Sequence, residues 1–300
     1  MSRRQLFGVV LGLALAAPAG VRAAGAEDEK AVEAAIAAVQ KLAGRVLRDE
    51  DRRTRPVTDV SLFGSEATDA DLKLLAPFRK LQALDLGGTH VTAAGMDDVA
   101  GFANLHSLRL RMTGVTDAGL TRLAPLKKKL SFLSLDSTAV TDAGMKDVAG
   151  FRGLIELDLG RTAVTDAGLK ELAALKNLRT LTLTSTKVTD AGVQALAGLT
   201  GLTDVNLGET QVTDGALKVL AKYRTLARLD LTLTQVTDAG MKHLAALEFV
   251  TDLHLAGTKV TDAGLEHFAG MRRLEVLALH DVPLTEVGLK RLAEIGRAHV

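Results

Sequence analysis

Two sets of residues in this 300-residue chain have the types and spacing to bind metal ions. Asp230, His254 and His280 lie 24 and 26 residues apart, and they offer the oxygen and nitrogen ligands that zinc accepts. Aspartates also recur at a nearly constant interval, and stacked carboxylates are suitable calcium ligands: Asp117, Asp142, Asp166, Asp190, Asp214, Asp238 and Asp262. The absence of cysteine excludes disulfides and thiolate ligands. Whether either set can bind a metal ion depends on the strands and helices that position its residues.

Other kinds of active-site chemistry lack a matching motif. The sequence contains no G-x-S-x-G nucleophile motif and no convincing Ser-His-Asp cluster. Its 28 glycines are dispersed and are not grouped into a phosphate-binding loop. We therefore expect a protein that is not an enzyme and that needs no cofactor.

The positioning elements come from an internal repeat. The pentapeptide VTDAG occurs six times, beginning at Val115, Val140, Val164, Val188, Val236 and Val260. Ten units with a 24-residue period follow the pattern L-x-x-L-x-L-x-x-T-x-V-T-D-A-G-L-x-x-L-A-x-L-x-x and begin at residues 57, 81, 105, 130, 154, 178, 202, 226, 250 and 274. Only the third unit is longer, by one residue within KKK at 127–129, which indicates a bulge in a surface loop.

Each unit predicts one short strand and one short helix. Residues 154–159 (LIELDL) alternate apolar and polar side chains, as a half-buried strand does. In 166–175, Leu169, Leu172, Ala173 and Leu175 share one helical face. Stacked copies bury these faces together, and strands stack more closely than helices, so the stack must curve. The expected fold is an α/β solenoid with parallel strands on the concave face and short helices on the convex face.

The VTDAG segment is interpreted as the corner between strand and helix. Either Thr165 or Asp166 is expected to cap the helix, which gives the aspartate series a structural role in preference to calcium binding. Gly168 lets the helix approach the neighbouring coil. The Thr at the ninth position of eight successive units, from Thr89 to Thr258, offers hydroxyls that can satisfy loop carbonyls.

The repeat resembles the leucine-rich repeat family, specifically the short bacterial type whose helices begin TDAGL. The resemblance covers residues 57–293, although this chain has Thr where the family commonly has Asn or Cys. It implies a leucine-rich repeat horseshoe and a non-enzymatic protein that binds its partner on the concave face.

The concave columns of the predicted solenoid are acidic. Positions three, five, seven and eight of the ten units hold ten acidic residues and four arginines, a net charge of −6. Arg228 is expected between Asp204 and Asp252, and Arg109 beside Asp85. This charge disfavours nucleic acid and favours a basic protein or peptide. The candidate binding residues are Asp85, Arg109, Phe132, Glu156, Asp158, Asp204, Asn206, Arg228, Asp230, Asp252 and His254.

In this arrangement Asp230 and His254 become direct cross-strand neighbours. His280 is expected diagonally from His254, about 7–8 Å away. A zinc-like site is geometrically conceivable there, but no short His spacing supports it, and solvated side chains are the favoured interpretation.

The N-terminal 56 residues differ from the repeats. Residues 1–26 combine the basic MSRR, an apolar segment at 6–17 and Ala24-Gly25-Ala26, which together predict an export signal and no membrane span after cleavage. SRRQLFG resembles the twin-arginine signal, so that route and ordinary secretion both stay open. Residues 27–43 predict a capping helix, 45–47 an edge strand, and 48–56 a polar linker.

The last seven residues, 294–300 (EIGRAHV), depart from the repeat and match the translation of a common short-read sequencing adapter. We therefore expect adapter sequence in place of the natural C-terminus. The leading interpretation is an exported binder of a basic protein or peptide located in the periplasm, cell envelope or extracellular space. A structural element of the envelope is the alternative. An F-box-like ubiquitin-ligase adaptor is disfavoured by the export signal and by the absence of an F-box segment before Val57.

Overall fold

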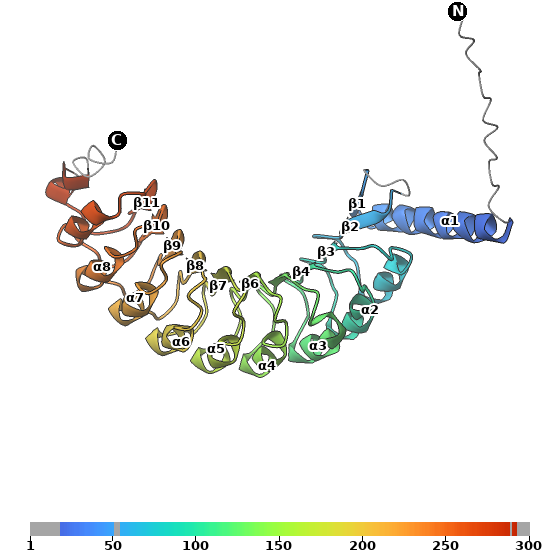
Figure 1. Ribbon diagram of the computed structural model, residues 1–300, viewed down its shortest axis with the longest axis horizontal. Helices are drawn as coiled ribbons and strands as arrows, with labels where there is room; N and C mark the ends of the chain where they lie inside the picture. Colours follow the sequence, from blue (N-terminus) through green and yellow to red (C-terminus); the bar gives the residue numbers. More distant parts are fainter. Residues whose placement is uncertain (1–18, 51–54, 289, 293–300) are drawn as a thin grey trace, which may run out of the picture.

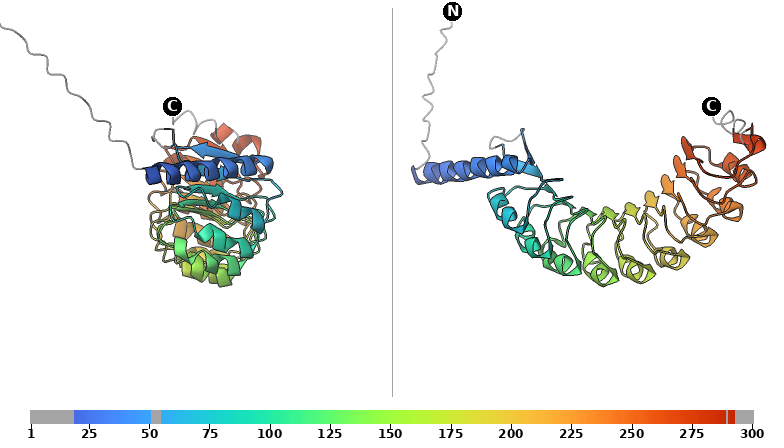
Figure 2. Two further views of the ribbon diagram at one scale, coloured as in Figure 1. Left: turned by 90° about the vertical axis from the view of Figure 1, so that its right-hand side faces the viewer. Right: turned by 180° about the vertical axis from the view of Figure 1, so that it is seen from behind.

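The computed structural model describes residues 19–50, 55–288 and 290–292. The chain forms an open horseshoe, with the strands along its inner edge and the helices along its outer edge (Figures 1 and 2). This is the α/β solenoid that the repeat predicts. The helix α1 and the strand β11 lie at opposite ends of the arc.

One sheet of eleven strands lines the concave face, and its strands follow the order of the sequence. β1 pairs antiparallel with β2, and every later pair is parallel. The strands are β1 (Arg45–Arg48), β2 (Val57–Ser61), β3 (Ala83–Asp85), β4 (Ser107–Arg109), β5 (Phe132–Ser134), β6 (Glu156–Asp158), β7 (Thr180–Thr182), β8 (Asp204–Asn206), β9 (Arg228–Asp230), β10 (Asp252–His254) and β11 (Val276–Ala278).

The convex face is built from short α-helices and 3₁₀ turns. The sequence predicts helices throughout, but in several coils a 3₁₀ turn replaces or precedes the helix. The α-helices are α2 (Met96–Ala100), α3 (Asp117–Arg122), α4 (Met145–Val148), α5 (Asp166–Leu172), α6 (Asp190–Ala195), α7 (Asp214–Leu220) and α8 (Asp238–Leu244). The 3₁₀ turns are η1 (Asp69–Leu75), η2 (Ala93–Gly95), η3 (Ala124–Leu126), η4 (Asp142–Gly144) and η5 (Gly264–Gly270).

The core is a continuous stack of leucine and valine side chains between the sheet and the helices. In the central coil Leu157, Leu159, Leu169 and Leu172 are all buried, which confirms the predicted faces. The threonines of the ninth position are buried as well, and Thr162 Oγ1 donates to the Leu159 carbonyl at 2.7 Å. The same bond recurs from Thr89 to Thr258, as predicted.

Of the two residues expected to cap the helix, Thr165 and Asp166, the structure uses the threonine, and the aspartates do not cap their own helices. Thr165 Oγ1 accepts from the Ala167 N–H at 3.2 Å and is the cap of α5. Asp142, one coil earlier, instead accepts from the Thr165 N–H at 2.7 Å, the Thr165 hydroxyl at 2.6 Å and the Gly168 N–H at 3.0 Å. Each aspartate thus joins its coil to the next, because its side chain reaches across the stacking interface.

This bonding, here called the aspartate ladder, links eight Asp–Thr pairs and uses both carboxylate oxygens: Asp69–Thr92, Asp117–Thr141, Asp142–Thr165, Asp166–Thr189, Asp190–Thr213, Asp214–Thr237, Asp238–Thr261 and Asp262–Thr285. Ala93 stands where the second coil would supply an aspartate. The ladder therefore explains the repeated Thr-Asp pair without a calcium ion.

The glycine of VTDAG makes room for the ladder. A Cβ at Gly168 would lie 2.5 Å from Asp142 Oδ1 and 2.8 Å from Met145 Cγ. One coil reverses the usual Ala-Gly order to Gly215-Ala216, and there a Cβ at Gly215 would lie 2.3 Å from Asp190 Oδ2. In both arrangements the approaching carboxylate faces the residue that lacks a Cβ.

The end of the solenoid near the N-terminus is covered by α1 (Ala19–Lys41), which lies beside β1 and η1 (Figures 1 and 2). Val39 and Ala35 are buried against the first coil. The helix begins before residue 27, where the sequence predicts its start, and it runs through Ala24-Gly25-Ala26. The apolar segment at 6–17 and residues 294–300 lie outside the described residues. None of the described helices has both the length and the apolar character needed to cross a bilayer.

Candidate functional site

The parallel register of the sheet aligns the predicted concave columns. Asp204, Arg228 and Asp252 are successive partners along one column. Asn206, Asp230 and His254 are successive partners along the next. Side chains on the same face of neighbouring strands lie within contact distance, so the sheet holds these six groups at fixed spacing.

These six residues surround a hollow of about 200 Å³ on the concave face. The central residues of β7, β8 and β9 (Leu181, Val205 and Leu229), whose side chains are buried in the core, also line it, and Thr180 and Thr182 of β7 border one side. The full lining is Thr180, Leu181, Thr182, Asp204, Val205, Asn206, Arg228, Leu229, Asp230, Asp252 and His254. More than half of the predicted binding residues therefore meet at one place, here called the acidic hollow.

Only part of the charge in the acidic hollow is neutralised internally. Arg228 Nε forms an ion pair with Asp204 Oδ1, but Arg228 does not bridge to Asp252 as expected. Asp252 instead accepts from the hydroxyl of its neighbour Thr251 at 2.5 Å. Asn206 Nδ2 donates to Asp230 Oδ2 at 3.1 Å. Two of the carboxylates that line the hollow, those of Asp230 and Asp252, thus have neutral hydrogen-bond partners, and the lining carries a net negative charge.

A second role belongs to the polar residues at the fifth position of the repeat. Asp230 Oδ1 accepts from the Thr232 N–H at 2.9 Å, and Asp158 Oδ1 accepts from the Gly160 N–H at 3.0 Å. Asp85 and Asn206 make the same bond to the second residue after them. These side chains therefore hold the turn that follows each strand, in addition to lining the concave face.

The turn that they hold contains an unusual backbone position. The eighth residue of all ten units has a positive φ, between 51° and 69°. This left-handed conformation favours glycine, yet bulky residues such as Met112 and Leu233 occupy it. Both side chains are exposed at the rim of the sheet. Sequence reasoning missed this feature, whose available signal was the presence of Gly64, Gly88 and Gly257 in the same column.

Asp158 is the concave carboxyl most affected by its surroundings. Burial raises its pKa above the ordinary value of 3.8, and nearby Asp136 raises it further. Hydrogen bonds from the Gly160 N–H and the Ser134 hydroxyl (2.9 Å to Oδ2) oppose this effect, as does Arg161. Asp158 is therefore held by its neighbours, whereas Glu156 on the same strand is exposed.

The concave face near β4 differs in charge from the acidic hollow. Arg109 does not pair with Asp85 as predicted, because its guanidinium lies over the ring of Phe132, 4.4 Å from the centroid. Arg111 likewise lies over the ring of Phe63, at 4.3 Å. Arg109 and Phe132 are among the predicted binding residues, but neither stacked pair was expected from the sequence.

The proposed metal ligands do not converge. Asp230 and His254 are paired across β9 and β10 as predicted, but His280 follows the end of β11 and is exposed. Among the residues that the structure describes, no three His, Asp or Glu side chains are grouped closely enough to hold a metal ion. The geometry thus gives no support to a zinc site at these positions.

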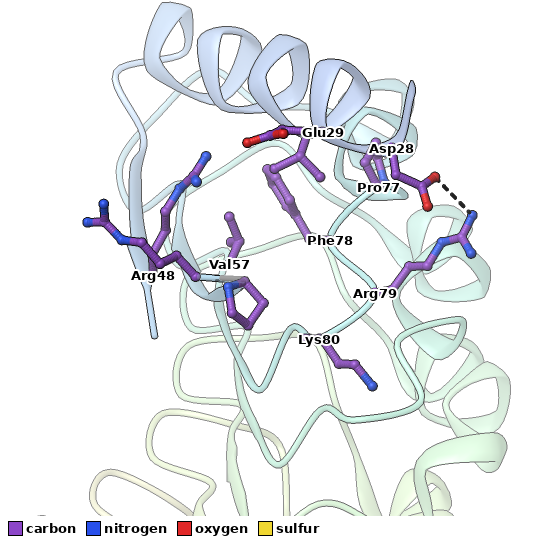
Figure 3. Close-up of a pocket in the computed structure, with 11 residues that line it drawn as sticks. Asp28, Glu29, Arg48, Val57, Pro77, Phe78, Arg79 and Lys80 are labelled. Atoms are coloured by element: carbon purple, nitrogen blue, oxygen red, sulfur yellow. Dashed lines mark ion pairs between the residues drawn. The ribbon is translucent and has the colours of Figure 1, made fainter. Parts of the chain in front are cut away.

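A larger hollow of about 650 Å³ lies between α1 and the first coil (Figure 3). Most of its charged residues already have partners: Arg48 pairs with Glu33, Arg55 with Glu50, and Arg79 with Asp28 at 3.9 Å. Arg55 directly follows residues 51–54, which lie outside the described part of the chain. The concave face therefore remains the better-defined candidate site.

Comparison with known proteins identifies the repeat. Residues 154–173, 174–197, 224–245 and 246–269 match the family described as Leucine Rich repeat. No protein with curated annotation matches the chain at a significant level.

Solved structures with the same fold include two internalins from Listeria monocytogenes. One is 18% identical with a TM-score of 0.54, covering 88% of this chain and 92% of the internalin. The other, internalin C2, is 26% identical with a TM-score of 0.56, covering 84% and 92%. The Arabidopsis receptor kinase HAESA, solved with the peptide hormone IDA and the co-receptor SERK1, is 17% identical with a TM-score of 0.56, covering 78% of this chain and 39% of the receptor.

Proposed function

Because this chain is a leucine-rich repeat protein, we propose that it binds a basic protein or peptide on its concave sheet. The observation that carries this proposal is the acidic hollow, where six residues from three adjacent strands meet around about 200 Å³. Concave sites with a few converging polar groups are typical of ligand binding. The repeat family generally mediates protein interactions, and HAESA, which is similar in fold, has been solved in complex with a peptide hormone.

A basic partner follows from the charges of the hollow. Asp230 and Asp252 present carboxylates that lack a cationic partner among the described residues. A lysine or arginine entering between them would form charge-assisted hydrogen bonds, which are stronger than neutral ones. The lining is open to solvent, so the interaction is expected to weaken as salt is added.

The test uses a fluorescent peptide rich in lysine and arginine as the probe. The variant Asp204→Asn, Asp230→Asn, Asp252→Asn removes three charges with little change in side-chain shape. Each amide keeps one acceptor oxygen, so Asp204 and Asp230, which accept through both carboxylate oxygens, lose one acceptor each. The matched control, Glu171→Gln, Glu248→Gln, Glu266→Gln, removes three exposed carboxylates outside the concave sheet.

We expect the concave variant to lose at least about tenfold in affinity, since a charge-assisted hydrogen bond contributes about 1.5–3 kcal/mol. The control variant should bind like the native protein, apart from a small effect of net charge. Equal losses in the two variants would show that binding reflects overall charge, and the proposed site would be rejected.

We further propose that the protein acts outside the cytoplasm, on the basis of the basic, apolar and Ala24-Gly25-Ala26 segments of its leader. Intact-mass measurement of protein from the cell envelope should give a chain that begins at Glu27. Recovery of the full-length chain only from the cytoplasm would contradict export. Changing Arg3 and Arg4 to Lys should stop export only by the twin-arginine route.

A further inference from the structure

We propose that the concave face of β4 holds a second, anion-binding subsite, formed by Arg109 and Arg111, that receives a carboxylate of the same partner. This inference rests on the proposed function, because it adds an acidic end to a partner whose basic end occupies the acidic hollow. The partner class is therefore an extended peptide segment with opposite charges at its two ends.

The two arginines are held in a way that suits them to bind an anion. Each guanidinium carbon lies over an aromatic ring, that of Arg109 over Phe132 at 4.4 Å from the centroid and that of Arg111 over Phe63 at 4.3 Å. Stacking on a ring occupies one face of the guanidinium and leaves its N–H edge available. The rings are supplied by the fourth and first coils, so the two arginines of β4 and its following turn are braced from both sides.

These arginines also differ from the other two on the concave face. Arg161 pairs with Asp136 at 2.8 Å, and Arg228 pairs with Asp204. Arg109 and Arg111 form no ion pair with any described carboxylate, and Arg109 has only a long contact of 3.4 Å with the Ser107 hydroxyl. The third coil contributes no acidic residue to the concave columns, so it is a positive site on an otherwise acidic face.

The distance between the subsites sets the length of the partner. β4 and β9 are separated by five strand spacings, which amounts to about 24 Å along the sheet at ~4.8 Å each. An extended chain advances about 3.3–3.4 Å per residue, so about seven residues cover this distance. The intervening surface of β6 and β7 carries exposed or half-buried polar side chains such as Thr180 and Thr182, over which a peptide could pass.

Three synthetic probe peptides test this arrangement. The first carries two glutamates and two arginines separated by seven serine and glycine residues. The second replaces both glutamates by glutamine, and the third shortens the spacer to three residues. Each peptide is made in both chain directions. Its affinity is measured for the native protein, for the double variant Arg109→Gln, Arg111→Gln and for the control variant Arg161→Gln. Circular dichroism checks that each protein is folded.

The native protein should bind the first peptide about tenfold more tightly than the glutamine peptide in at least one direction, as expected for charge-assisted hydrogen bonds. The Arg109, Arg111 variant should lose this preference while it still binds the glutamine peptide normally. The Arg161 variant should keep the preference, and the short peptide should lose it.

Equal affinity of the native protein for the glutamate and glutamine peptides in both directions would overturn the anion subsite. Retention of the preference in the Arg109, Arg111 variant would overturn it as well. Failure of the glutamine peptide to bind at all would instead contradict the acidic hollow, so the two proposals fail separately.

Discussion

Removing one carboxylate from the aspartate ladder should loosen the joint between two coils. Asp142 accepts three hydrogen bonds from the next coil: from the Thr165 N–H, the Thr165 hydroxyl and the Gly168 N–H, all at 3.0 Å or less. A hydrogen bond to a charged group contributes about 1.5–3 kcal/mol, but bonds to one group are not additive, and water can reach this half-buried site. We therefore expect Asp142→Ala to reduce the free energy of unfolding by about 2–4 kcal/mol.

The isosteric Asp142→Asn keeps Oδ1 as the acceptor of both N–H groups and loses only the charge and the second acceptor. It should reduce the free energy of unfolding by about 1–2 kcal/mol, which is less than the reduction expected for the alanine variant. Urea unfolding followed by circular dichroism measures both values, with the slope checked because coils of a repeat protein can unfold separately. An alanine variant within about 0.5 kcal/mol of the native protein would refute the ladder as a source of stability.

Three further predictions concern the central coils. Leu172→Ala should cost about 2–5 kcal/mol and exposed Lys170→Ala less than about 0.5 kcal/mol in urea unfolding, and similar costs would show that the helix faces are misassigned. Gly168→Ala should destabilise by about 1–3 kcal/mol because its Cβ meets the ladder carboxylate, whereas the double variant with Ala167→Gly, which copies the Gly-Ala order of another coil, should recover most of that loss in the same assay. Asp158→Asn should raise the free energy of unfolding at neutral pH, because the raised pKa of Asp158 means that its ionised form is unfavourable in the fold. This gain in stability should disappear as the pH falls through the folded pKa towards the ordinary value of 3.8. A gain that persists at lower pH would contradict this explanation.

The arrangement of strands and core was predictable because it depends on periodicity alone. The 24-residue interval sets which leucines share a face, and the parallel register then aligns the columns that contain Asp204, Arg228 and Asp252. The ladder was less accessible, because Thr-Asp at a helix start is also the sequence signature of a cap. The choice between the two depends on the distance between neighbouring coils, which the sequence does not specify.

The pairing of individual side chains on the concave face was predicted less well. Arg109 was assigned to Asp85 on the basis of charge and adjacency, but the long side chain reaches the ring of Phe132 instead, and Asp85 is engaged by the Gly87 N–H. Arg228 had two equivalent aspartate neighbours in its predicted column, Asp204 and Asp252, and in the structure it pairs with Asp204. A long side chain can choose among several partners of similar energy, so columns were predictable whereas contacts were not.

The central claim, that a basic partner binds the concave sheet at the acidic hollow, is tested most directly by locating a bound probe. A lysine- and arginine-rich peptide carrying a photoreactive group can be cross-linked to the native protein at low salt, and the modified residues identified by mass spectrometry. We expect cross-links concentrated on the concave positions of β7 to β10, competed away by unlabelled peptide and lost in the Asp204, Asp230, Asp252 variant. Competable cross-links concentrated on the convex helices, or unchanged in that variant, would contradict it.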